Sequence, residues 1–231
     1  MIIKGLQKTT LLDFPTKVAC TVFTGGCNFR CPFCHNASLV IDPDYSQLID
    51  TNRFFEYLDK RKGILDGVCI TGGEPLLQKD IEDFIKEIRS RGYAVKLDTN
   101  GSVPKTLSEL VNKKLVDYVA MDIKSSQKKY FEACGTNRYT DSVIESVNIL
   151  LSSDIEYEFR TTVVRELHNK EDFHDIGKWI QGAPRYFLQQ FKDSGDLIEK
   201  QIGFSAYNKE EMEEILAIVK EYIPTASLRG I

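Results

Sequence analysis

Six times along this chain, a short apolar segment rich in β-branched residues runs into turn residues and then into a helical pattern. Strands that alternate with helices predict a parallel sheet with right-handed crossover connections. With about six such units, the expected fold class is α/β, as an incomplete TIM-type barrel, and a doubly wound open sheet is the alternative. The strands are expected at residues 18–23, 67–71, 94–97, 118–121, 156–164 and 185–191, with a short terminal strand at Ser227-Leu228.

The helices are expected where apolar residues recur on one face. One such pattern consists of Leu77, Ile81, Phe84, Ile85 and Ile88, and Gly92 is expected to end that helix. Similar patterns predict helices near residues 52–62, 105–114, 143–151, 173–180 and 212–223. The chain is expected to be a single domain over residues 1–231, with a short polar lead-in at 1–16 and the partial barrel at 17–231.

Composition limits the classes of function. The formal net charge of −4 argues against general nucleic-acid binding, which usually needs a basic surplus. No apolar run approaches membrane-spanning length, and the first residues lack a secretory signal pattern, so a cytoplasmic location without membrane contact is expected. In a reducing compartment, clustered cysteines are more often metal ligands or catalytic groups than disulfides.

Unusual residues follow the C-terminal ends of four expected strands. Parallel α/β sheets bind their ligands at these strand ends, so the four segments are expected to converge on one face. The segments are the cysteine loop that begins at Thr24, Gly72-Gly73-Glu74-Pro75, Asp98-Thr99-Asn100-Gly101 and Asp122-Ile123-Lys124.

Three cysteines of the loop, Cys27, Cys31 and Cys34, have the spacing C-x3-C-x2-C. Three thiolates at this spacing can hold an iron–sulfur cluster and leave one iron without a protein ligand. The alternative is a structural zinc site completed by His35 or a distant ligand. Zinc sites usually pair two separated knuckles, and the chain has no second one. The other cysteines are expected to be structural: Cys20, Cys69 and Cys134.

The remaining strand-end residues each have two interpretations. Gly72 and Gly73 lack side chains, so their backbone can approach a ligand closely, although a Gly-Gly turn is also common in ordinary loops. Glu74 can add a charge-assisted hydrogen bond to a ligand or can order the turn.

The charged residues at the other strand ends also have two interpretations each. Asp98 and Asp122 can bind a ligand or cap helices. Lys124 and Arg160 suit a ligand carboxylate, or are solvated charges. Among the weaker candidates, two histidines are expected at the surface and one tryptophan is expected to be a packing residue: His168, His174 and Trp179.

These motifs together resemble a known superfamily. C-x3-C-x2-C after the first strand, with Phe33 before the last cysteine, resembles the radical S-adenosylmethionine superfamily, and Gly72-Gly73-Glu74-Pro75 matches its motif after the second strand. Cys34-His35-Asn36 and the segments beginning at Asp98 and Asp122 look like the glycyl-radical-enzyme activases. Residues 5–15 are similar to the opening of anaerobic ribonucleoside-triphosphate reductase activating proteins.

The resemblance implies one 4Fe–4S cluster on the three cysteines, with S-adenosylmethionine bound at the fourth iron. One electron, from reduced flavodoxin or ferredoxin, then cleaves the cofactor to a 5′-deoxyadenosyl radical, which removes a glycine Cα hydrogen from a partner enzyme. It also implies that Asp98, Thr99, Asp122 and the Ala120 carbonyl hold the nucleoside end or a monovalent cation. The cofactor-binding residues it implies are Phe33, Gly72, Gly73, Glu74, Asp98, Thr99, Asp122, Lys124 and Arg160.

Two features narrow the resemblance. Residues 35–68 contain no cysteine, so one cluster is expected rather than a ferredoxin-like insertion. Formate-lyase activators usually carry a Tyr-His pair where this chain has Leu188-Gln189-Gln190-Phe191, which favours the reductase activators. The alternatives are a pyruvate formate-lyase activator or another glycyl-radical activase, a small-molecule enzyme such as a 7-carboxy-7-deazaguanine synthase, and a zinc-stabilised binding module without enzyme activity.

Overall fold

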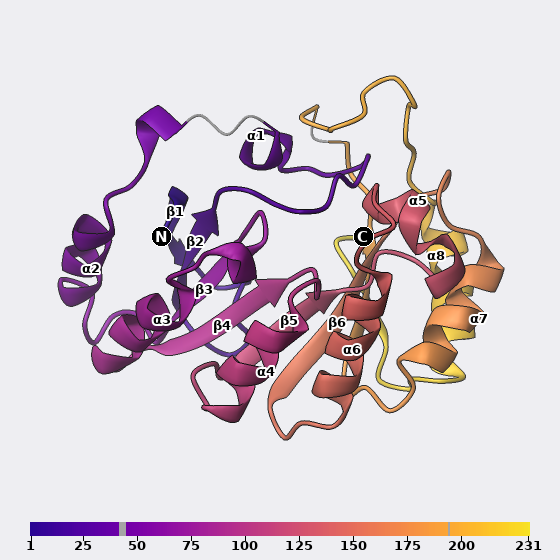
Figure 1. Ribbon diagram of the computed structural model, residues 1–231. Coiled ribbons are helices and arrows are strands. Elements are labelled where there is room, and N and C mark those ends of the chain that lie inside the picture. Colours follow the sequence, from indigo (N-terminus) through magenta and orange to yellow (C-terminus); the bar gives the residue numbers. More distant parts are fainter. Residues whose placement is uncertain (42–44, 194) are drawn as a thin grey trace. The chain divides into compact units, whose positions relative to one another are not determined.

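The computed structural model describes residues 1–41, 45–193 and 195–231. Figure 1 shows an α/β chain in which strands and helices alternate. The described strands form a sheet in the order β1 to β8, with the bounds Ile3–Thr10 (β1), Ala19–Thr24 (β2), Gly67–Gly72 (β3), Ala94–Thr99 (β4), Tyr118–Asp122 (β5), Glu156–Val163 (β6), Tyr186–Gln190 (β7) and Ser227–Arg229 (β8). A doubly wound sheet reverses its strand order at one point, and this order never reverses, which decides against that alternative.

Helices follow each strand from β2 to β7, so the six expected strand–helix units are confirmed. The α-helices are Ala37–Val40 (α1), Thr51–Asp59 (α2), Ile81–Ser90 (α3), Pro104–Asn112 (α4), Tyr130–Cys134 (α5), Thr140–Leu151 (α6), Lys170–Trp179 (α7) and Lys209–Lys220 (α8). Three short 3-10 turns are Tyr45–Gln47 (η1), Pro75–Leu77 (η2) and Gln127–Lys129 (η3). None of the helices in the described residues is long and apolar enough to span a bilayer.

The N-terminal lead-in contains a strand that sequence analysis missed. β1 pairs antiparallel with β2, with Leu6 opposite Val22, whereas β2–β3, β3–β4, β6–β7 and β7–β8 pair in parallel. β1 stands at the end of the strand order, and its residues Gln7, Lys8 and Thr9 are exposed. An edge strand buries few side chains, so its sequence lacks the apolar pattern that reveals the others.

One helix prediction was also wrong in part. Leu77 belongs to the turn η2 and is 41% exposed, so it does not lie on the buried face of α3. That face consists of Ile81, Phe84, Ile85 and Ile88, as expected. Gly92 follows the helix with a φ of +88°, the left-handed conformation that favours glycine at a helix end.

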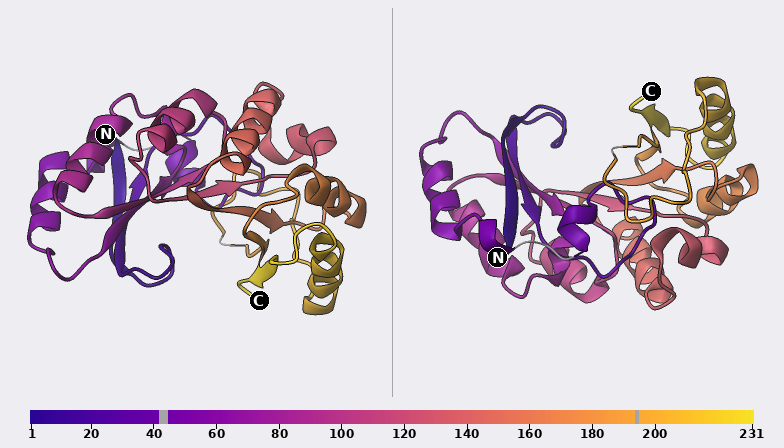
Figure 2. Two further views of the ribbon diagram at one scale, coloured as in Figure 1. Left: turned by 90° about the horizontal axis from the view of Figure 1, so that it is seen from below. Right: turned by 90° about the horizontal axis from the view of Figure 1, so that it is seen from above.

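The chain packs into two compact units. The first holds β1 to β4 and α2 to α4 and consists of Met1–Asn28, Ser38–Thr99 and Val103–Ala120. In both views of Figure 2, α3 and α4 lie on one side of its strands. Phe54 of α2 stacks on Phe84 of α3 with ring centroids 5.4 Å apart. Burial of such side chains drives the packing of the helices on the sheet.

The second unit holds β6 to β8 and α5 to α8 and consists of Phe29–Ala37, Asn100–Ser102 and Met121–Ile231. In Figure 2, α6, α7 and α8 follow one another along the outer side of β6 and β7. Asn169 and Asn208 begin α7 and α8 with reciprocal capping boxes. The core contains Val143, Val147, Phe159, Phe173, Ile176, Leu188, Met212, Ile215 and Val219.

Candidate active site

The cysteine loop crosses from one unit to the other: Cys27 belongs to the first, and Cys31 and Cys34 belong to the second. Cys31 is 6% exposed, and the other two are half-buried. None of the six cysteines, all within the described ranges, forms a disulfide bond. Each thiol is therefore in the reduced form, and its deprotonation would make it a metal ligand.

Backbone hydrogen bonds hold the second half of the loop inside its unit. The Arg30 amide donates to the Cys134 carbonyl at 2.9 Å, and the Glu199 amide donates to the Pro32 carbonyl at 2.9 Å. At Gly135, which follows α5 with a φ of +70°, a Cβ would lie 2.2 Å from the Arg30 carbonyl oxygen. A glycine at this point lets the loop contact the end of α5 directly.

Phe33 and His35, which flank the last cysteine of the loop in the sequence, belong to a chain of contacting aromatic rings. Phe33 is 4% exposed and meets Phe204 edge-on at 6.5 Å, and Phe204 in turn meets Phe191 at 6.3 Å. His35 stacks on Phe191 with centroids 5.3 Å apart. Burial, together with the positive charge of Lys124, lowers the pKa of His35. The neutral imidazole is therefore favoured at this position, next to the last cysteine of the loop.

In the first unit, the Gly72-Gly73 turn packs closely against the backbone of Thr24 and Gly26. Gly73 donates its amide to the Thr24 carbonyl at 2.9 Å, and Glu74 donates its amide to the Gly26 carbonyl at 2.8 Å. A Cβ at Gly73 would lie 1.9 Å from the Gly26 oxygen, and one at Gly72 would lie 2.4 Å from the Thr24 nitrogen. Both glycines permit the close approach of two strand ends, directly before Cys27.

Glu74 orders this turn. Its side chain is completely buried, and its Oε1 atom accepts hydrogen bonds from the Leu76 amide at 3.0 Å and from the Thr99 hydroxyl at 2.8 Å. Glu74 thus links the ends of β3 and β4 within the first unit. Of the two interpretations of Glu74, the turn-ordering role is the one that its contacts display.

Asp98 has partners that sequence analysis did not anticipate. It does not cap α4, because that helix begins after Val103 without a side-chain cap. Its carboxylate forms an ion pair with Lys96, which is 2% exposed in the same strand. The Cys69 thiol lies 3.8 Å from both the Asp98 Oδ1 atom and the Lys96 ammonium. The missed signal was a lysine between Val95 and Leu97, two residues before an aspartate.

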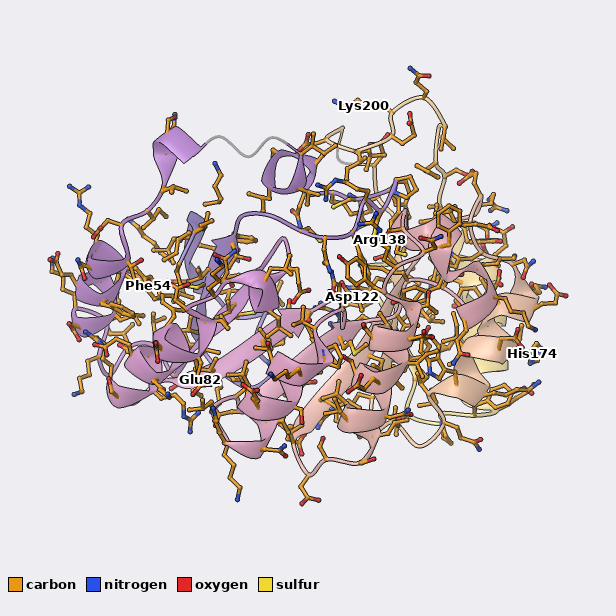
Figure 3. The ribbon with its side chains drawn as sticks, in the orientation of Figure 1. Phe54, Glu82, Asp122, Arg138, His174 and Lys200 are labelled. Atoms are coloured by element: carbon orange, nitrogen blue, oxygen red, sulfur yellow. The ribbon has the colours of Figure 1, made fainter. Side chains whose placement is uncertain are left out.

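In the second unit, Asp122 pairs with two basic residues that were expected to meet a ligand carboxylate or solvent, Lys124 and Arg160. The Lys124 ammonium and the Arg160 guanidinium each donate to the Asp122 carboxylate at 3.0 Å. Burial would raise the pKa of Asp122, but the charges of Arg160 and Lys124 outweigh it and lower that pKa to about 2. The cluster of three carries a net charge of about +1 at neutral pH. The Asp122 side chain, labelled in Figure 3, is 29% exposed.

Lys124 is held at its backbone as well. Burial would lower the pKa of its ammonium, but the charges of Asp122 and then Cys31 raise it, so Lys124 stays protonated. The Tyr130 hydroxyl lies 3.4 Å from the Lys124 amide and accepts its hydrogen bond. Asp122 does not cap a helix either, because η3 and α5 begin after Ser126 and Lys129.

His168 was expected at the surface, and that expectation was wrong: it is 2% exposed. Its Nδ1 atom accepts from the Val164 amide at 3.0 Å, so the proton lies on Nε2, which donates to the Lys124 carbonyl at 2.8 Å. Burial lowers the pKa of this imidazole. Sequence alone carried no signal for this contact, which joins residues 44 positions apart.

The other two weaker candidates, His174 and Trp179, have no contact described above with the candidate site residues. His174 lies on α7, near the outer edge of the ribbon in Figure 3, with its Nδ1 atom 3.1 Å from the Tyr222 hydroxyl. Trp179 meets Tyr130 edge-on at 6.0 Å, which agrees with a packing role.

The three thiols of the cysteine loop are a donor set that suits an iron–sulfur cluster. Within the residues that the structure describes, no three or more His, Cys, Asp or Glu side chains lie close enough to share one metal ion. An iron–sulfur cluster takes one thiolate per iron, so its donors need not meet around a single ion. The three thiols of the loop supply that chemistry.

Comparisons with known proteins agree with this donor set. A sequence model of the Radical SAM superfamily matches residues 21–180. "Putative glycyl-radical enzyme activating enzyme MJ1227" of Methanocaldococcus jannaschii is 31% identical over 100% of this chain and 96% of its own length. A second protein of the same organism, "Putative glycyl-radical enzyme activating enzyme MJ1632", is 26% identical over 69% of this chain and 62% of its own.

A solved structure shows the same fold. Streptococcus suis SuiB bound to the precursor peptide SuiA superimposes with a TM-score of 0.72 at 16% identity, over 91% of this chain. The chain spans about half of SuiB, or 48% of its length. At this identity the likeness concerns the fold alone, and it agrees with the α/β class expected from the sequence.

Proposed function

The chain belongs to the radical S-adenosylmethionine superfamily, and we propose that it acts within it as a glycyl-radical-enzyme activating enzyme. Membership implies a 4Fe–4S cluster and S-adenosylmethionine as cofactors. The observation that carries the proposal is the similarity over the full chain to a relative whose name states this activity. When bound, the cofactors supply the reductive cleavage of a carbon–sulfur bond and the hydrogen abstraction that follows it.

The partner we propose is an anaerobic ribonucleoside-triphosphate reductase. Residues 5–15 support it, together with the absence of cysteine from residues 35–68. Reduced flavodoxin or ferredoxin is the proposed electron donor, and the cytoplasm is the proposed location. A pyruvate formate-lyase or another glycyl-radical enzyme is the alternative partner.

This chain's residues have separate tasks in the proposal. Cys27, Cys31 and Cys34 hold the cluster as thiolates. Asp122 keeps Lys124 and Arg160 together, and their net positive charge suits the carboxylate of the methionine moiety. The further residues proposed to contact the cofactor are Phe33, Gly72, Gly73, Glu74, Asp98 and Thr99.

Loop order and exclusion of water are the remaining tasks. Phe33, Phe191 and Phe204 place apolar rings beside the cluster-binding cysteines of the second unit, and such a shell reduces access of water to a metal centre. The Gly73–Gly26 backbone contact fixes the entrance of the loop at Cys27. These features orient and protect, while the bound cofactors carry the chemistry.

The proposal is tested on protein purified without air. Iron and acid-labile sulfide are measured, and the reduced protein is incubated with S-adenosylmethionine while methionine and 5′-deoxyadenosine are quantified. We expect about four irons per chain and formation of both products. Zinc without iron or sulfide, or no cleavage by iron-loaded protein, would contradict the proposal. The triple variant Cys27→Ala, Cys31→Ala, Cys34→Ala is the control for non-specific iron.

A further inference from the structure

Lys96 places a positive charge in the interior of the first unit. It lies in β4 between Val95 and Leu97, and its side chain is 3% exposed. Side chains two residues apart in a strand point to the same face, so Lys96 and Asp98 are neighbours on β4. The ammonium donates to the Asp98 Oδ1 atom, and the Asp98 side chain is 14% exposed.

Three uncharged residues also lie near Lys96 on the first unit's sheet: Cys69, Thr21 and Tyr118. Cys69 of β3 is opposite Lys96 in the parallel register, and Thr21 of β2 is opposite Cys69. The Cys69 thiol lies 3.8 Å from the ammonium, and the Tyr118 ring centroid lies 5.9 Å from it. The carboxylate that pairs with the Lys96 ammonium is that of Asp98.

A buried ammonium is costly unless a carboxylate pairs with it, and the same holds for the carboxylate. A well-packed apolar side chain would stabilise a strand interior at least as well. The pair therefore suggests a role beyond stability. Asp98 lies near the C-terminal end of β4, where ligands bind in this fold class. Lys96 lies two residues earlier in the same strand, farther from that end.

We propose that Lys96 is a positioning residue whose ammonium supplies a fixed positive charge at Asp98, in the place that a diffusible monovalent metal ion would otherwise take. The carboxylate of Asp98 is then oriented toward the cofactor without a bound cation. This inference rests on the proposed function, because it assumes that Asp98 contacts S-adenosylmethionine.

The first test uses the wild-type protein alone. The cluster-loaded, unreduced protein is dialysed against S-adenosylmethionine in potassium, sodium or tetramethylammonium chloride at equal ionic strength. We expect the same dissociation constant in all three salts. A dissociation constant that rises about tenfold when tetramethylammonium replaces both metal ions would overturn the inference.

The second test compares Lys96→Met with Lys86→Met. Lys86 is in the same unit but is half-exposed on α3 and pairs with Glu82, so its variant is a matched control. In tetramethylammonium, Lys96→Met should bind S-adenosylmethionine roughly tenfold more weakly, the loss expected when a charge-assisted partner is removed. Potassium or sodium should restore part of this loss. Equal binding by Lys96→Met and wild type would contradict the inference.

A third readout does not depend on the cofactor. Crystals soaked in thallium(I) are expected to show no anomalous peak at Asp98 in wild type and a peak there in Lys96→Met. A thallium peak at Asp98 of wild type would refute the role of Lys96. If Lys96→Met does not fold, the wild-type salt series and the wild-type thallium soak still test the role of Lys96. Wild type that takes up iron but binds no S-adenosylmethionine would instead contradict the proposed function, while the thallium soak would still test Lys96.

Discussion

Gly73 faces Gly26 so closely that a Cβ at Gly73 would lie 1.9 Å from the Gly26 carbonyl oxygen. The oxygen also accepts the Glu74 amide at 2.8 Å, so the backbone cannot shift without breaking that hydrogen bond. Cys27 follows directly. The turn after β3 and the start of the cysteine loop are therefore held together by direct backbone contact within the first unit.

Gly73→Ala should displace the start of the loop. We expect a loss of at least about 2 kcal/mol in the free energy of unfolding and a lower iron content per chain, because the added methyl group overlaps backbone. Gly5→Ala is the control, since its Cβ would meet Phe23 at an ordinary 3.4 Å. Urea unfolding and iron analysis make the comparison, and an iron content equal in both variants would contradict it.

His168 should make stability depend on pH. Its pKa is lowered by burial, so the unfolded chain binds a proton more readily than the folded one does. The contribution of His168 is then complete above the unfolded pKa of about 6.5 and is lost as pH falls below it. The slope is at most about 1.4 kcal/mol per pH unit.

His168→Gln isolates this effect. Glutamine keeps one donor and one acceptor but does not titrate in this range. Between pH 7.5 and 5.5, the free energy of unfolding of wild type should fall more than that of the variant. His35, whose pKa is also lowered, contributes equally to both proteins and cancels in the difference. Parallel pH profiles would show that His168 is not held neutral.

Asp122→Asn removes the carboxylate that Lys124 and Arg160 share. Leaving two partly buried cations without their acceptor should cost roughly 2–3 kcal/mol of unfolding free energy. Because the pKa of Asp122 is lowered to about 2, its contribution is fully present above the unfolded pKa of about 3.9. The difference from wild type should therefore be the same at pH 5.5 and at pH 8. A difference that shrinks at pH 5.5 would mean that the carboxylate is not held ionised.

Alkylation of the metal-free protein should separate the cysteines by position. Burial raises the pKa of the Cys20 thiol to about 12, so at pH 8 it holds almost no thiolate. Cys27 and Cys34 are half-buried and should react with iodoacetamide while Cys20 does not. Mass spectrometry of peptides reads the pattern, and the unfolded protein, in which all six should react, is the control. Rapid labelling of Cys20 in the folded protein would contradict its burial.

Sequence patterns predicted the features that depend on residue periodicity and spacing. The six strand–helix units follow from alternating apolar segments, and the spacing C-x3-C-x2-C is the basis for the proposed cluster ligands. Glu74, Asp122 and Arg160 were named as candidates. The hydrogen bonds that join Glu74 and Asp122 to residues of other strands were not predicted, because a hydrogen bond between distant strands leaves no local pattern. Lys96 and His168 were missed or misplaced for the same reason: charged and polar residues are usually exposed, and only tertiary contacts bury them.

The central claim is that this chain installs a glycyl radical on a partner protein. The direct measurement mixes the reduced, iron-loaded chain and S-adenosylmethionine with an anaerobic ribonucleoside-triphosphate reductase and records the electron paramagnetic resonance spectrum. We expect a protein radical whose hyperfine splitting collapses when the partner carries glycine deuterated at Cα. Cleavage of S-adenosylmethionine without a radical on this reductase, on pyruvate formate-lyase or on any other glycyl-radical enzyme supplied would contradict it.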